Sequence, residues 1–289
     1  MDGYSVAALL ALVCGSADPT SALPTTATQI TLGGIINQDA DDTLAFTPDG
    51  RTVFFDRSEG TRKTIMVSRR VDGRWSIPVA APFSGRWFDQ NPVVSPDGKY
   101  LLFNSDRPVR RGGKPLVQSY FSPAGSPGSN IWRAERRGSG WAEPVHLDSA
   151  VNGDAFVDFP SVAADGTIYY MRFEALSRTM QLWRAGLHRG HYGMPERVIL
   201  GDGAAPIHDP AVAPDQSFIV FNYGKVSGGL GRLSIAFASR SGWTQPLDLG
   251  EVENADLPWG AHILPGNREV SVTGRKGIRK IGLDPWLRD

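Results

Sequence analysis

Several features that define common classes of protein are missing from this chain of 289 residues. A single cysteine, Cys14, excludes an intramolecular disulfide, a cysteine-based zinc site and a redox pair. The 30 basic and 30 acidic residues cancel, so no overall positive field attracts nucleic acid or an anionic membrane. No apolar run is long enough to span a bilayer. We therefore expect neither a nucleic-acid partner nor a transmembrane span.

Glycine and proline, in contrast, are abundant. The 33 glycines and 21 prolines make up about a fifth of the chain, against a typical share of roughly 12%. Hydrophobic residues reach 41% and aromatic residues 10%, which is enough apolar material for a core and argues against disorder. So many turn-forming residues together with so many aromatic residues indicate a large number of short strands.

The N-terminus resembles a secretory signal. Residues 6–13 (VAALLALV) are apolar, and Gly15 and Ala17 have the spacing of a cleavage site, although no Lys or Arg precedes them. We expect a signal peptide over residues 1–17, a flexible lead-in over residues 18–27, and a periplasmic or extracellular protein. The alternatives are a lipoprotein anchored at Cys14 and an apolar tail.

The chain contains an internal repeat. Four segments combine an apolar strand, a turn and a second alternating strand: FTPDGRTVFF from Phe46, VSPDGKYLLF from Val94, VAADGTIYYM from Val162 and VAPDQSFIVF from Val212. Asp-Gly between apolar runs predicts a hairpin with a two-residue type I′ turn. A third strand, an aromatic corner and a short fourth strand follow each turn. We expect the corner residues and two third-strand tryptophans to pack between units: Trp75, Trp141, Tyr192, Trp243, Trp132 and Trp183.

Four-stranded units that recur in this way predict a β-propeller. A fifth, degenerate unit over residues 261–283 supplies three strands, and the segment from Gln29 reads like the fourth strand of the preceding unit. We therefore expect an all-β fold, a five-bladed β-propeller over residues 28–289. Its blades are four-stranded and antiparallel, and the N-terminal strand closes the last one, which removes an open sheet edge.

The segment SPDGKYLLFNSDR, from Ser95 to Arg107, makes the resemblance specific. It is similar to the TolB-type, WD40-like propeller repeat, and the other units keep parts of the same signature. TolB itself resembles a six-bladed propeller with an additional N-terminal domain, and we expect neither feature here. Related repeats also precede the hydrolase domain of prolyl-oligopeptidase-like enzymes, whose G-x-S-x-G motif is absent here. The resemblance implies a fold, whereas propellers carry many functions.

Each segment that leads into a predicted inner strand carries an aspartate, and in a propeller these segments surround one mouth of the central channel. The aspartates are Asp41 or Asp42, Asp89, Asp158, Asp209 and Asp256. One interpretation is that each accepts backbone N–H groups and fixes a turn. The other is a ring of carboxylates that binds a cation such as Ca²⁺. We expect no required cofactor, and the candidate cation ligands are Asp42, Asp89, Asp209 and Asp256.

A catalytic hypothesis follows from resemblance to five-bladed arabinanase-like glycosidases, which use carboxylates at the channel mouth. The resemblance implies Asp41 or Asp42 as the base and Asp158 or Glu174 as the acid of glycoside cleavage. It also implies His262 beside a central ion. Trp87, Phe156 and Trp259 would stack on sugar rings, but the motifs of those glycosidases are not recognisable here.

Two groups of residues are candidates for binding. The first surrounds the channel mouth: Arg86, Trp87, Asp89, Phe156, Asp158, His208, Asp209, Asp256, Trp259 and His262. The second lies in an insertion over residues 106–129, which is either a partner contact or a mobile loop: Arg107, Arg110, Arg111, Tyr120 and Phe121. His208 also fits a surface residue, and His188 and His191 fit a solvated turn.

The sequence therefore favours an exported, monomeric binding scaffold that presents the channel mouth to a protein or cell-envelope glycan. The alternative is a carbohydrate-active enzyme of the hydrolase or lyase type that uses the mouth carboxylates. A sensor of small ligands in the channel is a third hypothesis.

Overall fold

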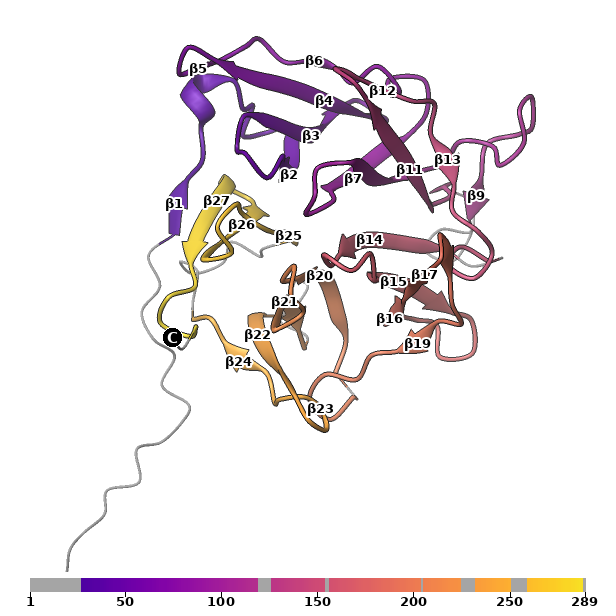
Figure 1. Ribbon diagram of the computed structural model, residues 1–289, viewed down its shortest axis with the longest axis vertical. Helices are drawn as coiled ribbons and strands as arrows, with labels where there is room; N and C mark the ends of the chain where they lie inside the picture. Colours follow the sequence, from indigo (N-terminus) through magenta and orange to yellow (C-terminus); the bar gives the residue numbers. More distant parts are fainter. Residues whose placement is uncertain are drawn as a thin grey trace, which may run out of the picture.

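Five small antiparallel sheets lie in a ring, and each has one strand next to the central axis (Figure 1). The computed structural model describes residues 27–118, 126–153, 156–203, 205–224, 232–250 and 259–287. The predicted five-bladed β-propeller is confirmed. We call the main strands of each blade a to d, from the axis outward. The a–b and c–d turns then lie on one face, and the b–c and d–a connections lie on the other.

The blades follow one another along the chain. Blade 1 contains β2 (Asp41–Phe46), β3 (Thr52–Glu59), β4 (Arg62–Val71), β5 (Arg74–Trp75) and β6 (Val79–Ala80). Blade 2 contains β7 (Asp89–Val94), β8 (Tyr100–Ser105), β11 (Asn130–Arg137), β12 (Gly140–Trp141) and β13 (Val145–His146). Blade 3 contains β14 (Val157–Val162), β15 (Ile168–Glu174), β16 (Thr179–Ala185), the hairpin β17 (Leu187–His188) and β18 (His191–Tyr192), and β19 (Glu196–Arg197).

Blade 4 contains β20 (Ile207–Val212), β21 (Phe218–Tyr223), β22 (Arg232–Ser239), β23 (Gly242–Trp243) and β24 (Leu247–Asp248). Blade 5 contains β25 (Trp259–Ile263), β26 (Glu269–Gly274), β27 (Gly277–Gly282) and β1 (Ala27–Gln29). A short 3-10 helix, η1 (Leu32–Gly34), leads from β1 towards blade 1, and the small ribbon β9 (Val117–Gln118) with β10 (Ser126–Pro127) belongs to the insertion. No helix long and apolar enough to cross a membrane occurs within the described ranges.

The N-terminal strand closes the ring as predicted. Ala27 of β1 pairs with Ile281 of β27, and Gln29 pairs with Arg279. The amide of Ile30 adds a hydrogen bond to the carbonyl of Ile278 (2.9 Å). The outer strand of blade 5 therefore comes from the N-terminal part of the chain, whereas its inner three strands come from the C-terminal part.

The a–b turns differ from the predicted two-residue type I′ turn. In blade 1 the amide of Gly50 donates to the carbonyl of Thr47 (2.8 Å), and the amide of Thr47 donates to Thr52 (2.9 Å). Gly50 has a φ of +65°, whereas Pro48 and Asp49 do not have positive φ. A type I′ turn needs positive φ at both central residues, which proline cannot adopt. The Pro-Asp pair therefore forms the centre of the turn, and the glycine follows it.

Apolar clusters fill the five junctions between blades. Phe54 of blade 1, Leu101 of blade 2 and Trp132 of blade 2 belong to one such cluster. Trp141 packs edge-on against Phe54 of the preceding blade, with ring centroids 5.4 Å apart, and Trp243 contacts Tyr169 in the same way at 6.3 Å. The predicted packing of these two corner tryptophans between blades is confirmed, although both rings are only half-buried.

Every inner strand contains a β-bulge at the same place, where one residue adopts positive φ: Thr43, Asn91, Phe159, Asp209 and Gly260. A bulge leaves a backbone amide without its partner in the ladder. Side chains of the preceding blade accept hydrogen bonds from four of these amides: Thr273 Oγ1 from Thr43 (3.3 Å), Asp56 Oδ1 from Asn91 (3.4 Å), Asn104 Oδ1 from Phe159 (3.1 Å) and Asp209 Oδ2 from Gly260 (3.0 Å). Buried polar residues near the axis therefore join neighbouring blades.

The junction between blades 3 and 4 departs from this pattern. The a–b turn of blade 3 is one residue shorter, because the amide of Ala163 donates to Thr167 only four positions later (2.9 Å). This shift places Met171 opposite Asp158, where blades 1 and 2 have Asp56 and Asn104. Methionine offers at most a weak acceptor, so the polar connection is interrupted at this junction.

Candidate functional site

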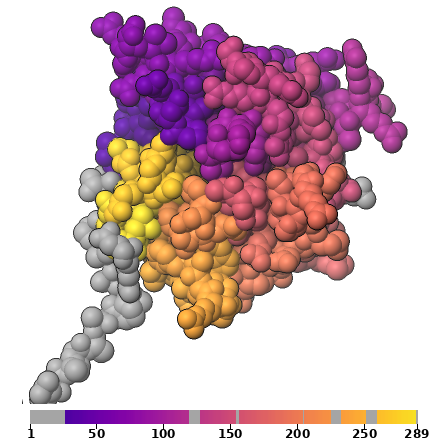
Figure 2. All heavy atoms as spheres, in the orientation of Figure 1, coloured from indigo at the N-terminus to yellow at the C-terminus, as the bar shows by residue number. Residues whose placement is uncertain are grey.

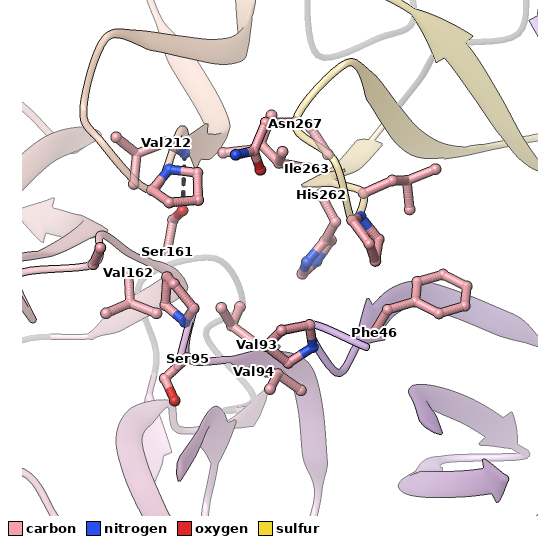
Figure 3. A pocket seen from close by; sticks show the side chains of 18 of the residues that line it. Phe46, Val93, Val94, Ser95, Ser161, Val162, Val212, His262, Ile263 and Asn267 are labelled. Carbon is pink, nitrogen blue, oxygen red and sulfur yellow. Dashed lines mark hydrogen bonds between the residues drawn. The ribbon is translucent and has the colours of Figure 1, made fainter. Parts of the chain in front are cut away.

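A cavity of about 430 Å³ lies at the axis, at the end where the a–b turns meet. We call it the basin. Its wall contains mostly small apolar residues from the second half of the inner strands: Phe46, Val93, Val94, Val162, Ala211, Val212 and Ile263. Each a–b turn contributes one residue to a collar around the opening of the basin: Pro48, Pro96, Ala164, Pro214 and Pro265. Figure 3 shows these side chains around the central space, with the hydrogen bond from the Val212 amide to Ser161 Oγ (2.9 Å) at one side.

His262 is the exceptional residue of the basin. The equivalent positions of the other inner strands, directly after the bulge, carry Ala45, Val93, Ser161 and Ala211. The imidazole of His262 points into the cavity (Figure 3). Burial lowers its pKa to about 4, although the charge of Asp56 acts in the opposite direction. At neutral pH the basin therefore contains an uncharged imidazole, with one donor and one acceptor nitrogen.

A layer of charged side chains lies nearer the opposite face, and we call it the polar layer. Lys63 Nζ bonds to Asp42 Oδ2 (2.8 Å) and Asp56 Oδ2 (2.7 Å), and Trp259 Nε1 donates to Asp42 Oδ1 (3.3 Å). Burial alone would lower the pKa of Lys63, but the charges of Asp56 and Asp42 outweigh burial and raise it. For Asp42, burial outweighs Lys63 and raises the pKa.

Two buried aspartates complete the polar layer. Burial raises the pKa of Asp158 to about 6, although the carboxylate accepts bonds from the Phe159 amide (3.0 Å) and Asn91 Nδ2 (2.8 Å). Burial and the charge of Asp158 raise the pKa of Asp209 to about 7, against the hydrogen bonds that Asp209 accepts from Gly260 and Asn222. These carboxyl groups consequently hold protons well above the ordinary pKa of an aspartate.

These shifts predict how stability depends on pH. The folded protein keeps protons on Asp158 and Asp209 that the unfolded chain loses, so their contribution falls as the pH rises from about 4 to about 7. His262 acts in the opposite direction, because its lowered pKa makes stability rise from about pH 4 to about pH 6.5. Histidines of the unfolded chain still titrate near pH 6.5, and His208 also has a lowered pKa, so the two effects overlap. Comparison with Asp209→Asn isolates the carboxyl effect. We expect the urea midpoint of the wild type, relative to that of Asp209→Asn at the same pH, to fall as the pH rises from about 5 to about 8; a difference that does not change with pH would contradict the assignment.

The aspartates predicted to form one ring occupy three different register positions. Asp41 and Asp89 pair with Arg57 and Ser105 of the second strands, Asp42 and Asp158 lie one residue further along, and Asp209 is itself the bulge residue. Neighbouring residues of a strand point to opposite sides, so the five side chains cannot be equivalent. The last of the predicted aspartates, Asp256, lies outside the described residues.

Asp41 and Asp89 hold the loops that precede their strands. Asp41 receives two bonds from Arg57 (2.6 and 2.8 Å) and one from the amide of Asn37 (2.8 Å). Asp89 binds Arg107 Nη2 (2.7 Å) and Ser84 Oγ (2.7 Å). Within the part of the chain that the structure describes, no three His, Cys, Asp or Glu side chains are arranged to hold a metal ion.

The remaining predicted mouth residues are dispersed. Arg86 is exposed, with its guanidinium 4.9 Å from the ring centroid of Trp87. Burial lowers the pKa of His208, which lies opposite Asn222. Glu174, at the end of β15, has Arg172 as an ion-pair partner at 4.0 Å.

A second cavity, of about 410 Å³, lies between the insertion and blades 2 and 3, and Phe156 and His146 line it. The described part of the insertion projects from the side of the disc (Figure 2). Arg107 is buried, 7% exposed, whereas Arg110 and Arg111 are exposed. The two predicted aromatic contacts, Tyr120 and Phe121, lie outside the described residues.

Sequence reasoning missed Lys63, Asp56 and most of the basin. A signal for the polar layer existed, because Phe55-Asp56, Phe103-Asn104 and Phe221-Asn222 repeat an aromatic residue followed by a polar one at the end of an apolar strand. Within the basin, His262 is the one residue that was predicted from the sequence as a site residue.

Comparison with known proteins supports the fold. No protein-family model matches the chain, and no curated protein sequence matches it. Among solved structures, a putative TolB from Agrobacterium tumefaciens is 16% identical with a TM-score of 0.51, over 82% of this chain and 70% of that one. The gluconolactonase XC5397 from Xanthomonas campestris is 13% identical with a TM-score of 0.52, over 91% and 96% of the two chains.

The α-L-arabinofuranosidase PaAbf62A from Podospora anserina is 12% identical with a TM-score of 0.53, over 91% of this chain and 97% of that one. Identities this low show a shared fold only, so the activities of these proteins are not assigned to this chain. The five blades and the similarity to TolB structures together show that this chain has a TolB-like, five-bladed β-propeller fold.

Proposed function

We propose that this protein is an exported binding scaffold that holds a short apolar segment of a partner protein in the basin. The observation that carries this proposal is the cavity of about 430 Å³ at the axis, lined largely by valine, alanine and proline. Its size lies within the range of roughly 300–1,000 Å³ that is usual for binding pockets. The predicted signal peptide over residues 1–17 supports export.

The chemistry of the basin favours a protein segment over a glycan. Sugars bind to aromatic faces and to several polar groups, whereas the lining contains one aromatic residue, Phe46, and few polar side chains. The neutral imidazole of His262 can donate a hydrogen bond to, or accept one from, a backbone group of the bound segment. An apolar side chain next to an amide matches this combination.

The alternative predicted from the sequence, a carbohydrate-active enzyme, has less support. Asp41 is bound by Arg57, and Asp42 is bound by Lys63, so both candidate bases already have cationic partners. Asp158 is 6% exposed and accepts two internal hydrogen bonds. Catalysis by these residues stays a prediction.

Selection of displayed peptides on the intact protein tests the proposal. We expect apolar peptides to bind, and we expect Val93→Trp to weaken them about tenfold or more because the indole fills the cavity. Val93 lines the basin and is half-buried. Affinity would be measured by calorimetry, with thermal unfolding to confirm that each variant folds.

The matched control is Leu176→Trp, because Leu176 is fully exposed between β15 and β16. This variant should bind with unchanged affinity. Peptides that tolerate Val93→Trp and are lost on Trp87→Ala would instead assign binding to the face predicted from the sequence. A selection that yields no peptide sensitive to Val93→Trp would contradict the proposal.

A further inference from the structure

Carboxylates surround the opening of the basin. Each of the first four blades places an exposed aspartate directly after its collar residue: Asp49, Asp97, Asp165 and Asp215. In blade 5 the corresponding turn contains Gly266 and Asn267. Hydrogen bonds within the turns lower the pKa of Asp49 and of Asp215, through Thr47 and Ser217 respectively. A segment that enters the basin therefore passes a negatively charged rim.

The charges of the rim are balanced on one side. In blade 2, Lys99 Nζ lies 3.0 Å from Asp97. In blade 1, the positive charges of Arg51 and Arg136 act on Asp49. A bound partner would find little net charge above these two blades.

Blades 3 and 4 differ, because neutral groups satisfy their turn aspartates. Asp165 accepts bonds from the Thr167 amide (2.9 Å) and Gln216 Nε2 (2.9 Å). Asp215 accepts bonds from the Ser217 amide (3.0 Å) and hydroxyl (2.6 Å). Within the described residues, neither carboxylate has a cation in an ion pair. We call Asp165 and Asp215 the acidic pair.

The surroundings leave the acidic pair uncompensated and fixed in place. Arg184, on strand β16, is itself bound to Glu196 (2.8 Å), and Arg189 and Arg240 lie in the outer c–d turns. The amide of Ala164 donates to the carbonyl of Pro214 (2.7 Å), which holds the two turns together beside the collar. The rim therefore presents two negative charges at one side of an apolar opening.

We propose that the partner segment carries a lysine or arginine directly beside its apolar residues, and that this basic residue docks on the acidic pair. This inference rests on the proposed function of the basin. An apolar side chain fills the cavity, and the adjacent cation meets Asp165 and Asp215 at the rim. A glutamate or aspartate at the same position would be repelled, so the acidic pair determines specificity through charge complementarity.

The test compares the peptides selected by the intact wild-type protein with those selected by the double variant Asp165→Asn/Asp215→Asn. Asparagine keeps an oxygen acceptor for the turn amides, so the turns should persist. Among the peptides that Val93→Trp rejects, we expect lysine or arginine beside the apolar residues. Replacing that residue with glutamate should weaken binding about three- to tenfold, and the difference should shrink in about 0.5 M salt.

The double variant should lose the preference for basic peptides, whereas Asp72→Asn should keep it, because Asp72 is an exposed aspartate of an outer c–d turn. Basin-dependent peptides without a basic preference, or a preference that persists in the double variant, would overturn this inference and leave the proposed function standing. The absence of any peptide sensitive to Val93→Trp would overturn both.

Discussion

Replacing Lys63 with methionine should lower the free energy of unfolding at pH 7 by about 3–5 kcal/mol. The substitution leaves Asp42 and Asp56 without the ammonium group that both contact, at 2.8 and 2.7 Å. The Asp56 side chain is fully buried, so water cannot replace the lost partner. Urea unfolding followed by tryptophan fluorescence measures the change. The loss should shrink towards pH 4–5, because the unpaired carboxylates then take up protons in the folded state.

Two controls make this prediction specific. Lys99→Met removes an exposed lysine that also pairs with an aspartate, and it should cost at most about 1 kcal/mol. Adding Asp42→Asn and Asp56→Asn to Lys63→Met removes the unpaired charges and should recover much of the loss. If Lys63→Met were no more harmful than Lys99→Met, the polar layer would not be organised around Lys63.

Arg107→Ala should have an effect of similar size, a loss of about 3–5 kcal/mol in the free energy of unfolding. Arg107 Nη2 binds the fully buried carboxylate of Asp89 (2.7 Å), and the guanidinium lies over the rings of Phe103 and Trp132, 4.8 and 5.3 Å from their centroids. Truncation therefore removes an ion pair and an aromatic contact together. Thermal and urea unfolding both measure the loss.

The neighbouring arginines of the insertion provide the comparison. Arg110→Ala and Arg111→Ala remove exposed side chains and should change stability by no more than about 0.5 kcal/mol. Adding Asp89→Asn to Arg107→Ala should recover part of the loss, because the buried charge is then gone. A loss in Arg107→Ala as small as that in Arg110→Ala would show that Arg107 belongs to the surface.

The blade count could be predicted because its signals are local and repeated. The Pro-Asp-Gly turns mark the a–b hairpins at Asp49 and Asp97, and the resemblance of the segment after Gln29 to the fourth strand of another blade predicts the closure. The predicted turn type was wrong because the proline before Asp-Gly occupies the first central position of the turn, where its φ cannot be positive. The shorter turn of blade 3 was not predicted either. The sequence around Asp165 resembles the other turns, yet this turn is one residue shorter, and the pairing of the two strands shifts by one residue.

The site was harder to predict because it depends on register across blades. Five aspartates before five inner strands look equivalent in the sequence, yet the bulges place Asp41, Asp42 and Asp209 at three different positions. The partner of Asp42 is Lys63 on the third strand, and only the pairing of strands brings them together. The basin forms where five turns converge, which no single segment encodes.

The pairing of β1 with β27 also has a kinetic consequence. It joins Ala27 to Ile281, so the contact is among the least local in the chain. Bringing two such distant segments together costs about 5 kcal/mol in loop-closure entropy if the intervening chain is unfolded, but far less once the blades between them have formed. We therefore expect docking of β1 to be a late step of folding. Until that step, the outer edge of β27 offers unpaired backbone groups to other chains, so the protein is exposed to edge-to-edge aggregation until β1 docks.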